Sequence, residues 1–180
     1  MKTSLSLKVA VLAAILSGAP CCFPQSQHAE EAQSAKHFVE NLYAGYGPNG
    51  NPVSLSGANA DQVFDPSLIK LAKTLEEVGA GYVGALSYDH LCNCKDTNLT
   101  FPNLRIVVEP VTAHRATATV TFTGKDGAEN KILITLTSGA DHWRIDNIED
   151  FSGPRPYIDL RSLLSEEIKA SKKRFQGPGK

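Results

Sequence analysis

Hydrophobic side chains recur every three to four residues in three stretches of the chain, and this spacing predicts three helices. The first is expected from about Ala29 to Tyr46, where Gly47 and Pro48 follow. The second is expected to begin at Asp65, because Asp caps helix N-termini and Pro66 suits the first helical position. The third is expected near the C-terminus, with an apolar stripe of Leu160, Leu163, Leu164 and Ile168.

Between the second and third helices the pattern changes to alternating apolar and polar residues, which is typical of half-buried strands. From Thr112 to Thr123 the alternation places four apolar side chains on one face, namely Ala116, Ala118, Val120 and Phe122. Further strands are expected over Leu104–Glu109, Lys131–Thr137 and His142–Ile148, with Asp126-Gly127 in a hairpin turn. In the last strand Trp143 and Ile145 are expected on one face, and His142, Arg144, Asp146 and Ile148 on the other.

The order of these elements predicts an α+β fold in one domain, residues 27–174. Two N-terminal helices and one C-terminal helix are expected to pack on an antiparallel sheet of about four strands. Residues 175–180 are expected to form a frayed tail.

The first 26 residues have the features of a secretory signal peptide. Lys2 and Lys8 precede the short apolar run Val9–Leu16, and small residues follow it. The protein is therefore expected to be exported to the periplasm or the extracellular space. Cys21 and Cys22 raise the alternative of a lipid-anchored N-terminus, although Pro20 stands where a lipidation motif has a small residue.

The composition is that of a globular protein, with 42% hydrophobic and 21% charged residues. Without Lys2 and Lys8 the chain carries 16 basic and 19 acidic residues, a net charge of −3. This balance gives no basic field for a nucleic acid partner. We expect a membrane contact only if the N-terminus is lipidated.

Polar and metal-ligating residue types are densest in the loop from Tyr88 to Asp96, which contains Asp89, His90, Cys92 and Cys94. These types can bind zinc, but Cys-x-Cys is not the usual ligand spacing and no second ligand pair follows. A structural role is favoured, in which Asp and Asn side chains bind the loop's own backbone. Cys92 and Cys94 either pack as small apolar residues or form a small, strained disulfide ring.

A second polar group follows the last strand from His142 to Asp150. If His142, Arg144 and Asp146 line a concave sheet face, they could bind a polar ligand or perform acid–base chemistry. The alternative is structural, with Trp143 and Ile145 under the helices and Arg144 paired with Asp146. The sequence contains no phosphate loop, dinucleotide fingerprint, Gly-x-Ser-x-Gly or His-Glu-x-x-His motif, so no cofactor is expected.

The loop Tyr88–Asp96 and the strand Trp143–Ile148 together resemble the bacterial family called domain of unknown function 3828. The resemblance covers about Ala29 to Ser171 and implies a cone-like nuclear-transport-factor-2-like or cystatin-like fold. It also implies export, often as a lipoprotein. The family carries no established activity, and the residues that match its motif are Asp89, Asp96 and Asp146.

The leading hypothesis is a non-enzymatic exported domain that binds an envelope protein or a small ligand. Its candidate ligand-binding residues are Asp89, Asp96, His142, Arg144 and Asp146. One alternative is a small hydrolase or isomerase that uses Asp146 and His142 in a concave pocket. Another is a redox or metal module built on His90, Cys92 and Cys94.

Overall fold

The computed structural model describes residues 24–48, 50–79, 84–95, 99–139, 142–152 and 157–175. The expected leader up to residue 23, and the candidate residue Asp96, lie outside these ranges. No helix within the ranges combines the length and the apolar character that crossing a membrane requires.

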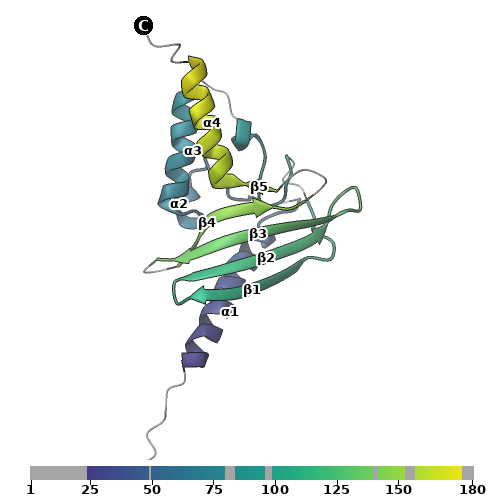
Figure 1. The fold of residues 1–180 in the computed structure, drawn as a ribbon. Helices are drawn as coiled ribbons and strands as arrows, with labels where there is room; N and C mark the ends of the chain where they lie inside the picture. Colours follow the sequence, from purple (N-terminus) through teal and green to yellow (C-terminus); the bar gives the residue numbers. More distant parts are fainter. Residues whose placement is uncertain are drawn as a thin grey trace, which may run out of the picture.

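The fold is α+β, as the sequence predicts, with a curved antiparallel sheet in the order β1-β2-β3-β4-β5 (Figure 1). The helices are α1 (Pro24–Ala44), α2 (Ala60–Val63), α3 (Pro66–Val78) and α4 (Leu160–Phe175), with a 3-10 turn η1 (Gly84–Ser87). The strands are β1 (Arg105–Thr112), β2 (Arg115–Thr123), β3 (Glu129–Ser138), β4 (Trp143–Asp150) and β5 (Ile158–Asp159). The sequence did not predict α2, η1 or β5, because segments of two to four residues are too short to show a period.

The helix signals were correct in type, and the bounds of the first helix were shifted. Asp65 caps α3 as expected, because its side chain accepts a hydrogen bond from the Ser67 amide at 2.8 Å. The first helix starts at Pro24, five residues before the expected start, and ends at Ala44. Tyr46 therefore lies just beyond α1, although its ring is still buried.

The strand alternation was correct for β2, whose side chains Ala116, Ala118, Val120 and Phe122 are all buried. The expected boundary before it was wrong, because β1 runs through Pro110 to Thr112. An edge strand tolerates proline, which lacks the N–H that a central strand would need. The hairpin between β2 and β3 is confirmed, and its turn residue Gly127 has a φ of 82°.

The helices take two different positions relative to the sheet. In Figure 1, α1 crosses one face behind β1 and β2, while α3 and α4 stand side by side beyond the β4–β5 edge. Three residues of the apolar stripe of α3 are fully buried there, namely Leu68, Ala72 and Leu75. The core therefore extends from the inner face of the sheet, covered by α1, to the space between the sheet edge and the α3–α4 pair.

A β-bulge interrupts β4 at Asp146. Thr135 pairs with Asn147 and Leu136 pairs with Ile145, so Asp146 has no opposite residue on β3. The extra residue shifts the alternation by one position. Ile148 is consequently buried on the same face as Ile145, and its expected place on the opposite face was wrong.

Opposite α1, the sheet has an outer face that no described element covers, hereafter the open face (Figure 1). Threonines dominate its centre, and each is half-buried between its neighbours. Its central residues on β2, β3 and β4 are Thr117, Thr119, Thr121, Leu133, Thr135, Thr137, Asn147 and Glu149.

Candidate functional site

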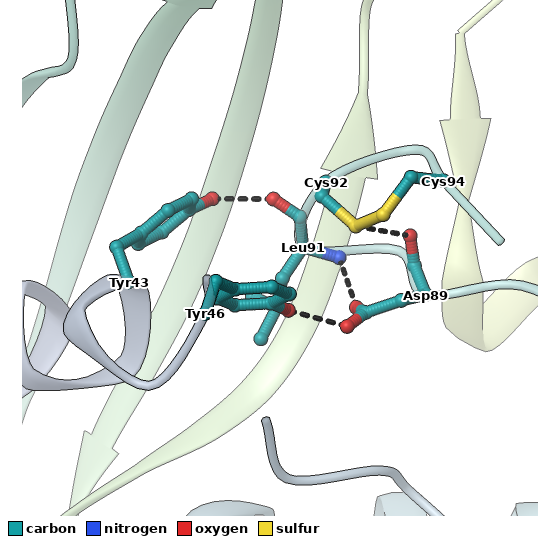
Figure 2. Close-up of a disulfide and its surroundings, with 6 residues drawn as sticks. All are labelled: Tyr43, Tyr46, Asp89, Leu91, Cys92 and Cys94. Atoms are coloured by element: carbon teal, nitrogen blue, oxygen red, sulfur yellow. Dashed lines mark hydrogen bonds between the residues drawn. A yellow bond between two sulfur atoms is a disulfide. The ribbon is translucent and has the colours of Figure 1, made fainter. Parts of the chain in front are cut away.

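Residues Tyr88–Lys95 form a compact turn, hereafter the disulfide loop (Figure 2). The Asp89 amide donates to the Cys94 carbonyl at 2.7 Å, and the Cys94 amide donates back at 3.2 Å. Within this small ring the structure joins Cys92 to Cys94 by a disulfide. Asn93 between them takes a φ of 50°, a left-handed conformation that Asn tolerates better than most residues.

Two tyrosines from the end of the first helical segment hold the disulfide loop in place (Figure 2). The Tyr43 hydroxyl donates to the Leu91 carbonyl at 2.6 Å, and the Tyr46 hydroxyl donates to Oδ2 of Asp89. The other oxygen of Asp89 accepts the Leu91 amide at 2.8 Å. Asp89 thus binds the loop's own backbone, as the structural interpretation of the sequence expects.

Burial controls the titration of this region. It raises the pKa of Asp89, although hydrogen bonds from Tyr46 and the Leu91 amide partly oppose the shift. It also raises the pKa of Tyr46, and the nearby Asp89 charge adds to that effect. Burial lowers the pKa of His90, which keeps the imidazole neutral while its Nε2 donates to the Ala85 carbonyl at 2.7 Å.

The disulfide loop separates two pockets. The first, about 220 Å³, lies between residues 52–56 and the disulfide loop, and Asp89 and His90 line it with apolar side chains such as Leu86 and Ile148. The second, about 400 Å³, lies between the disulfide loop and the β2–β3 hairpin. Cys94 and Lys95 line both pockets, so this loop is shared by the two cavities.

Asp146 lies in a different region, a group of charged and polar side chains that we call the Asp146 cluster. It consists of Asp65, Ser67, Arg115, Asp146 and Arg161. The bulge leaves the Asp146 carbonyl without a β3 partner, and Nε of Arg161 donates to it at 2.6 Å. The Asp146 carboxylate also accepts from Arg115 at 3.2 Å and from Arg161. The cluster therefore joins β2, β4, α3 and α4.

The remaining candidate residues do not converge on Asp146. His142 is exposed before β4, and Arg144 donates from Nε to the Asp61 carbonyl at 3.1 Å. The expected Arg144–Asp146 pair is therefore wrong, because Arg115 and Arg161 bind Asp146 instead. Neither His142 nor Asp146 lines either pocket, so the concave acid–base site that the enzyme alternative requires is not assembled in these two cavities.

The residues of the redox or metal alternative lie in the disulfide loop but are largely enclosed. Cys92 is 4% exposed and His90 is 6% exposed, while Cys94 is half-buried. Within the described ranges, no three His, Cys, Asp or Glu side chains are arranged to hold a metal ion.

Four residues that shape these regions were missed at the sequence level. Tyr43 and Tyr46 were assigned to the apolar stripe of the first helix, and Arg115 and Arg161 were not assigned a role. For the two tyrosines the sequence does contain a signal, because a tyrosine at a core position needs a hydrogen-bond partner for its hydroxyl. That rule does not identify the partner, which here lies more than 40 residues away.

The chain matches no family model and no curated protein. Among solved structures it is similar to a chain of the type VI native effector–immunity complex Tae3–Tai3 from Ralstonia pickettii. The two share 15% identity and a TM-score of 0.42, over 73% of this chain and 98% of that chain. The selenomethionine form of the same complex gives 14% identity and a TM-score of 0.43, over 71% of this chain and 98% of that chain. Likenesses at this level leave the family and the function of the chain open.

Proposed function

We propose that this chain is an exported, non-enzymatic domain that binds a partner protein through the open face. The single observation that carries the proposal is that one side of a well-packed sheet has no covering element among the described residues. The other side is filled by α1 and the core. An accessible, uncovered sheet surface on a rigid support suits contact with a second protein better than it suits enclosure of a substrate.

The chemistry of the open face fits such a contact. Its central threonines offer hydroxyl donors and acceptors on β-branched side chains, which lose little freedom when bound. Leu133 adds apolar surface near the middle. The Asp146 cluster fixes one end of the face through paired charges. This mixture of apolar and polar surface is the usual composition of a non-obligate protein interface.

The Asp146 carboxylate, which the enzyme alternative needs as a catalytic group, is already bound by two arginines. This also favours binding over catalysis. Asp146 accepts hydrogen bonds from two guanidinium groups, so it is held as a charge partner. A general base needs a free lone pair within reach of a substrate proton. His142 lies outside both pockets and cannot share one with Asp146 there.

Export, and membership of the domain of unknown function 3828 family with its cone-like fold, belong to the same proposal. The residues that support them are the N-terminal charge and apolar pattern and the two motifs that carry the resemblance. The intact mass of the protein, expressed with its own N-terminus, tests export. A start between Pro20 and Glu30 supports a cleaved leader, added acyl mass supports an anchor, and an uncleaved chain contradicts both.

Site-specific photocrosslinking from the open face tests the partner proposal. A photoreactive amino acid at Thr119 or Thr135 is expected to give a discrete adduct with an envelope protein in the source cells. The photoreactive amino acid placed instead at position 76, where Glu76 is exposed on α3, serves as the control. The identified partner, once purified, is expected to bind the wild-type chain and to bind a Thr119→Lys, Thr135→Lys variant at least about tenfold more weakly. Equal adducts from all three positions, or unchanged binding of the variant, would contradict the proposal.

A small ligand is the second candidate, and the pocket of about 220 Å³ favours it. Its lining combines apolar side chains with polar groups, among them Asp89 and His90, that could orient a small molecule. Native mass spectrometry of protein from the source cells tests this. A bound mass that disappears in a Leu86→Trp variant would support a ligand in this pocket.

A further inference from the structure

Strand β1 forms one edge of the sheet. It is the first strand of the sheet, and no other strand in the described ranges lies along its outer edge. Such an edge presents backbone N–H and C=O groups that another chain can use. Val107 and Val111 on this strand are 56% and 59% exposed, which is unusual for valine in a sheet.

The charges of β1 are arranged symmetrically about one residue. Arg105 lies two residues before Val107, and Glu109 lies two residues after it. All three side chains are exposed and share the face of β1 that continues the open face. Ile106 and Val108 point to the other face and remain half-buried beside α1.

Antiparallel pairing of two β1 strands around Val107 gives each side chain from Arg105 to Glu109 a complementary partner. Arg105 of each copy then lies opposite Glu109 of the other, and the two Val107 side chains face each other. Ile106 lies opposite Val108 on the inner face. Moving the axis by one residue along β1 would instead place Arg105 or Glu109 opposite Val107. Moving it by two residues would place Arg105 opposite Arg105, or Glu109 opposite Glu109.

We infer that β1 is a self-association site, at which a second copy of this chain pairs antiparallel about a two-fold axis through Val107. The two sheets join into one, and both open faces lie on the same side. The strand contact alone lies at the low end of interface sizes, so the dimer is weak, with a Kd on the order of tens of micromolar. The inference does not depend on the proposed partner of the open face.

A charge-exchange experiment tests the register. In a homodimer of Arg105→Glu, the new glutamate of each copy faces Glu109 of the other, so the interface contains two Glu–Glu pairs. In a homodimer of Glu109→Arg it contains two Arg–Arg pairs. Sedimentation velocity is expected to show a concentration-dependent dimer for the wild type. Each variant alone is expected to weaken it roughly tenfold. An equimolar mixture of the two variants is expected to restore dimer, because each Glu then faces an Arg.

Cysteine crosslinking tests the axis independently of affinity. Val107→Cys is expected to form an intermolecular disulfide under mild oxidation, because the two-fold axis places it opposite itself. Val111→Cys is the matched control, with nearly equal exposure on the same strand but a position off the axis. Circular dichroism verifies that all variants fold.

Three outcomes would overturn the inference. One is a wild type that stays monomeric at several hundred micromolar, well above the expected Kd. Another is a mixture of charge variants that fails to recover the dimer. The third is equal crosslinking at positions 107 and 111, which would indicate non-specific contact at an exposed edge.

Discussion

The disulfide loop and the Asp146 cluster each contain an aspartate that the sequence marks as ligand-binding, and the structure satisfies the two in opposite ways. Asp89 is buried and accepts from neutral donors, the Tyr46 hydroxyl and the Leu91 amide. Asp146 lies nearer the surface and accepts from the charged groups of Arg115 and Arg161. A conspicuous acidic residue in a sequence can therefore be a structural acceptor in either setting.

The physical difference between the regions is solvent access. In the disulfide loop a missing acceptor leaves buried donors without water to replace it, which is costly. In the Asp146 cluster the side chain of Arg115 is 52% exposed, so water and salt can compensate for a lost partner. The two regions should consequently differ in how much stability each aspartate contributes and in how that contribution responds to salt and pH.

The largest expected effect is in the disulfide loop. Asp89→Ala removes the acceptor of both the Tyr46 hydroxyl and the Leu91 amide, and should cost about 2–4 kcal/mol of unfolding free energy. Asp89→Asn should cost less, because its amide oxygen still accepts one of the two bonds. Urea unfolding followed by circular dichroism measures both variants. If Asp89→Ala loses no more stability than Asp146→Ala, burial does not determine how much each aspartate contributes to the free energy of unfolding.

A smaller effect is expected in the Asp146 cluster. Asp146→Ala removes both arginine contacts while the Arg161 bond to the residue's carbonyl remains, so the cost should be about 1 kcal/mol. The same urea experiment at low and at high salt provides the sharper measurement. The difference from wild type should shrink in high salt, whereas the Asp89→Ala difference should not. Salt-independence at Asp146 would mean that the bulge geometry, not charge pairing, determines its contribution.

The smallest expected effect is the pH dependence of the disulfide loop. Burial lowers the pKa of His90 below its ordinary value of 6.5, so the unfolded chain takes up a proton first as pH falls. Above about pH 6.5 the neutral His90 does not lower the stability of the fold. As pH falls from there toward the lowered pKa, protonation favours the unfolded chain and the free energy of unfolding decreases. A His90→Asn variant should lose less stability than wild type between pH 7 and pH 5. Parallel curves for the two proteins would show that His90 does not titrate differently on unfolding.

Asp89 should act with the opposite sign. Its folded pKa is raised, so the folded chain holds its proton more tightly than the unfolded chain does. The carboxyl group thus favours folding below its ordinary pKa of 3.8, and this contribution is lost as pH rises through the raised value. Comparing wild type with Asp89→Asn over that interval separates this contribution from that of His90.

Much of the local structure was predictable because its signals are short-range. The cap formed by Asp65 and Pro66, the alternation from Ala116 to Phe122 and the turn at Gly127 each depend on residues within a few positions. The α+β class followed from the order of these patterns. The wrong prediction for the face of Ile148 also has a local cause. The extra residue of the bulge at Asp146 shifts the alternation by one position, so Ile148 lies on the opposite face from the expected one.

The candidate sites were predicted as residues but not as arrangements. Asp89 and Asp146 were marked as candidate ligand-binding residues, and that role stays a prediction. The partners that the structure gives them, Tyr46, Arg115 and Arg161, lie between 15 and 43 positions away. The expected pairing of Arg144 with Asp146 rested only on their being two positions apart in the sequence. The bulge and the docking of α4 directed Asp146 to other partners.

The sequence by itself determined the types of the main elements, most of the buried positions on β2 and α3, and the charge symmetry of β1. These depend on the period of a helix or strand, which a few consecutive residues reveal. The tertiary structure alone decided which face of the sheet stays open, how α3 and α4 pack beyond its edge, and what binds each aspartate. Those features arise from contacts between distant segments, and their geometry exists only after the core has packed.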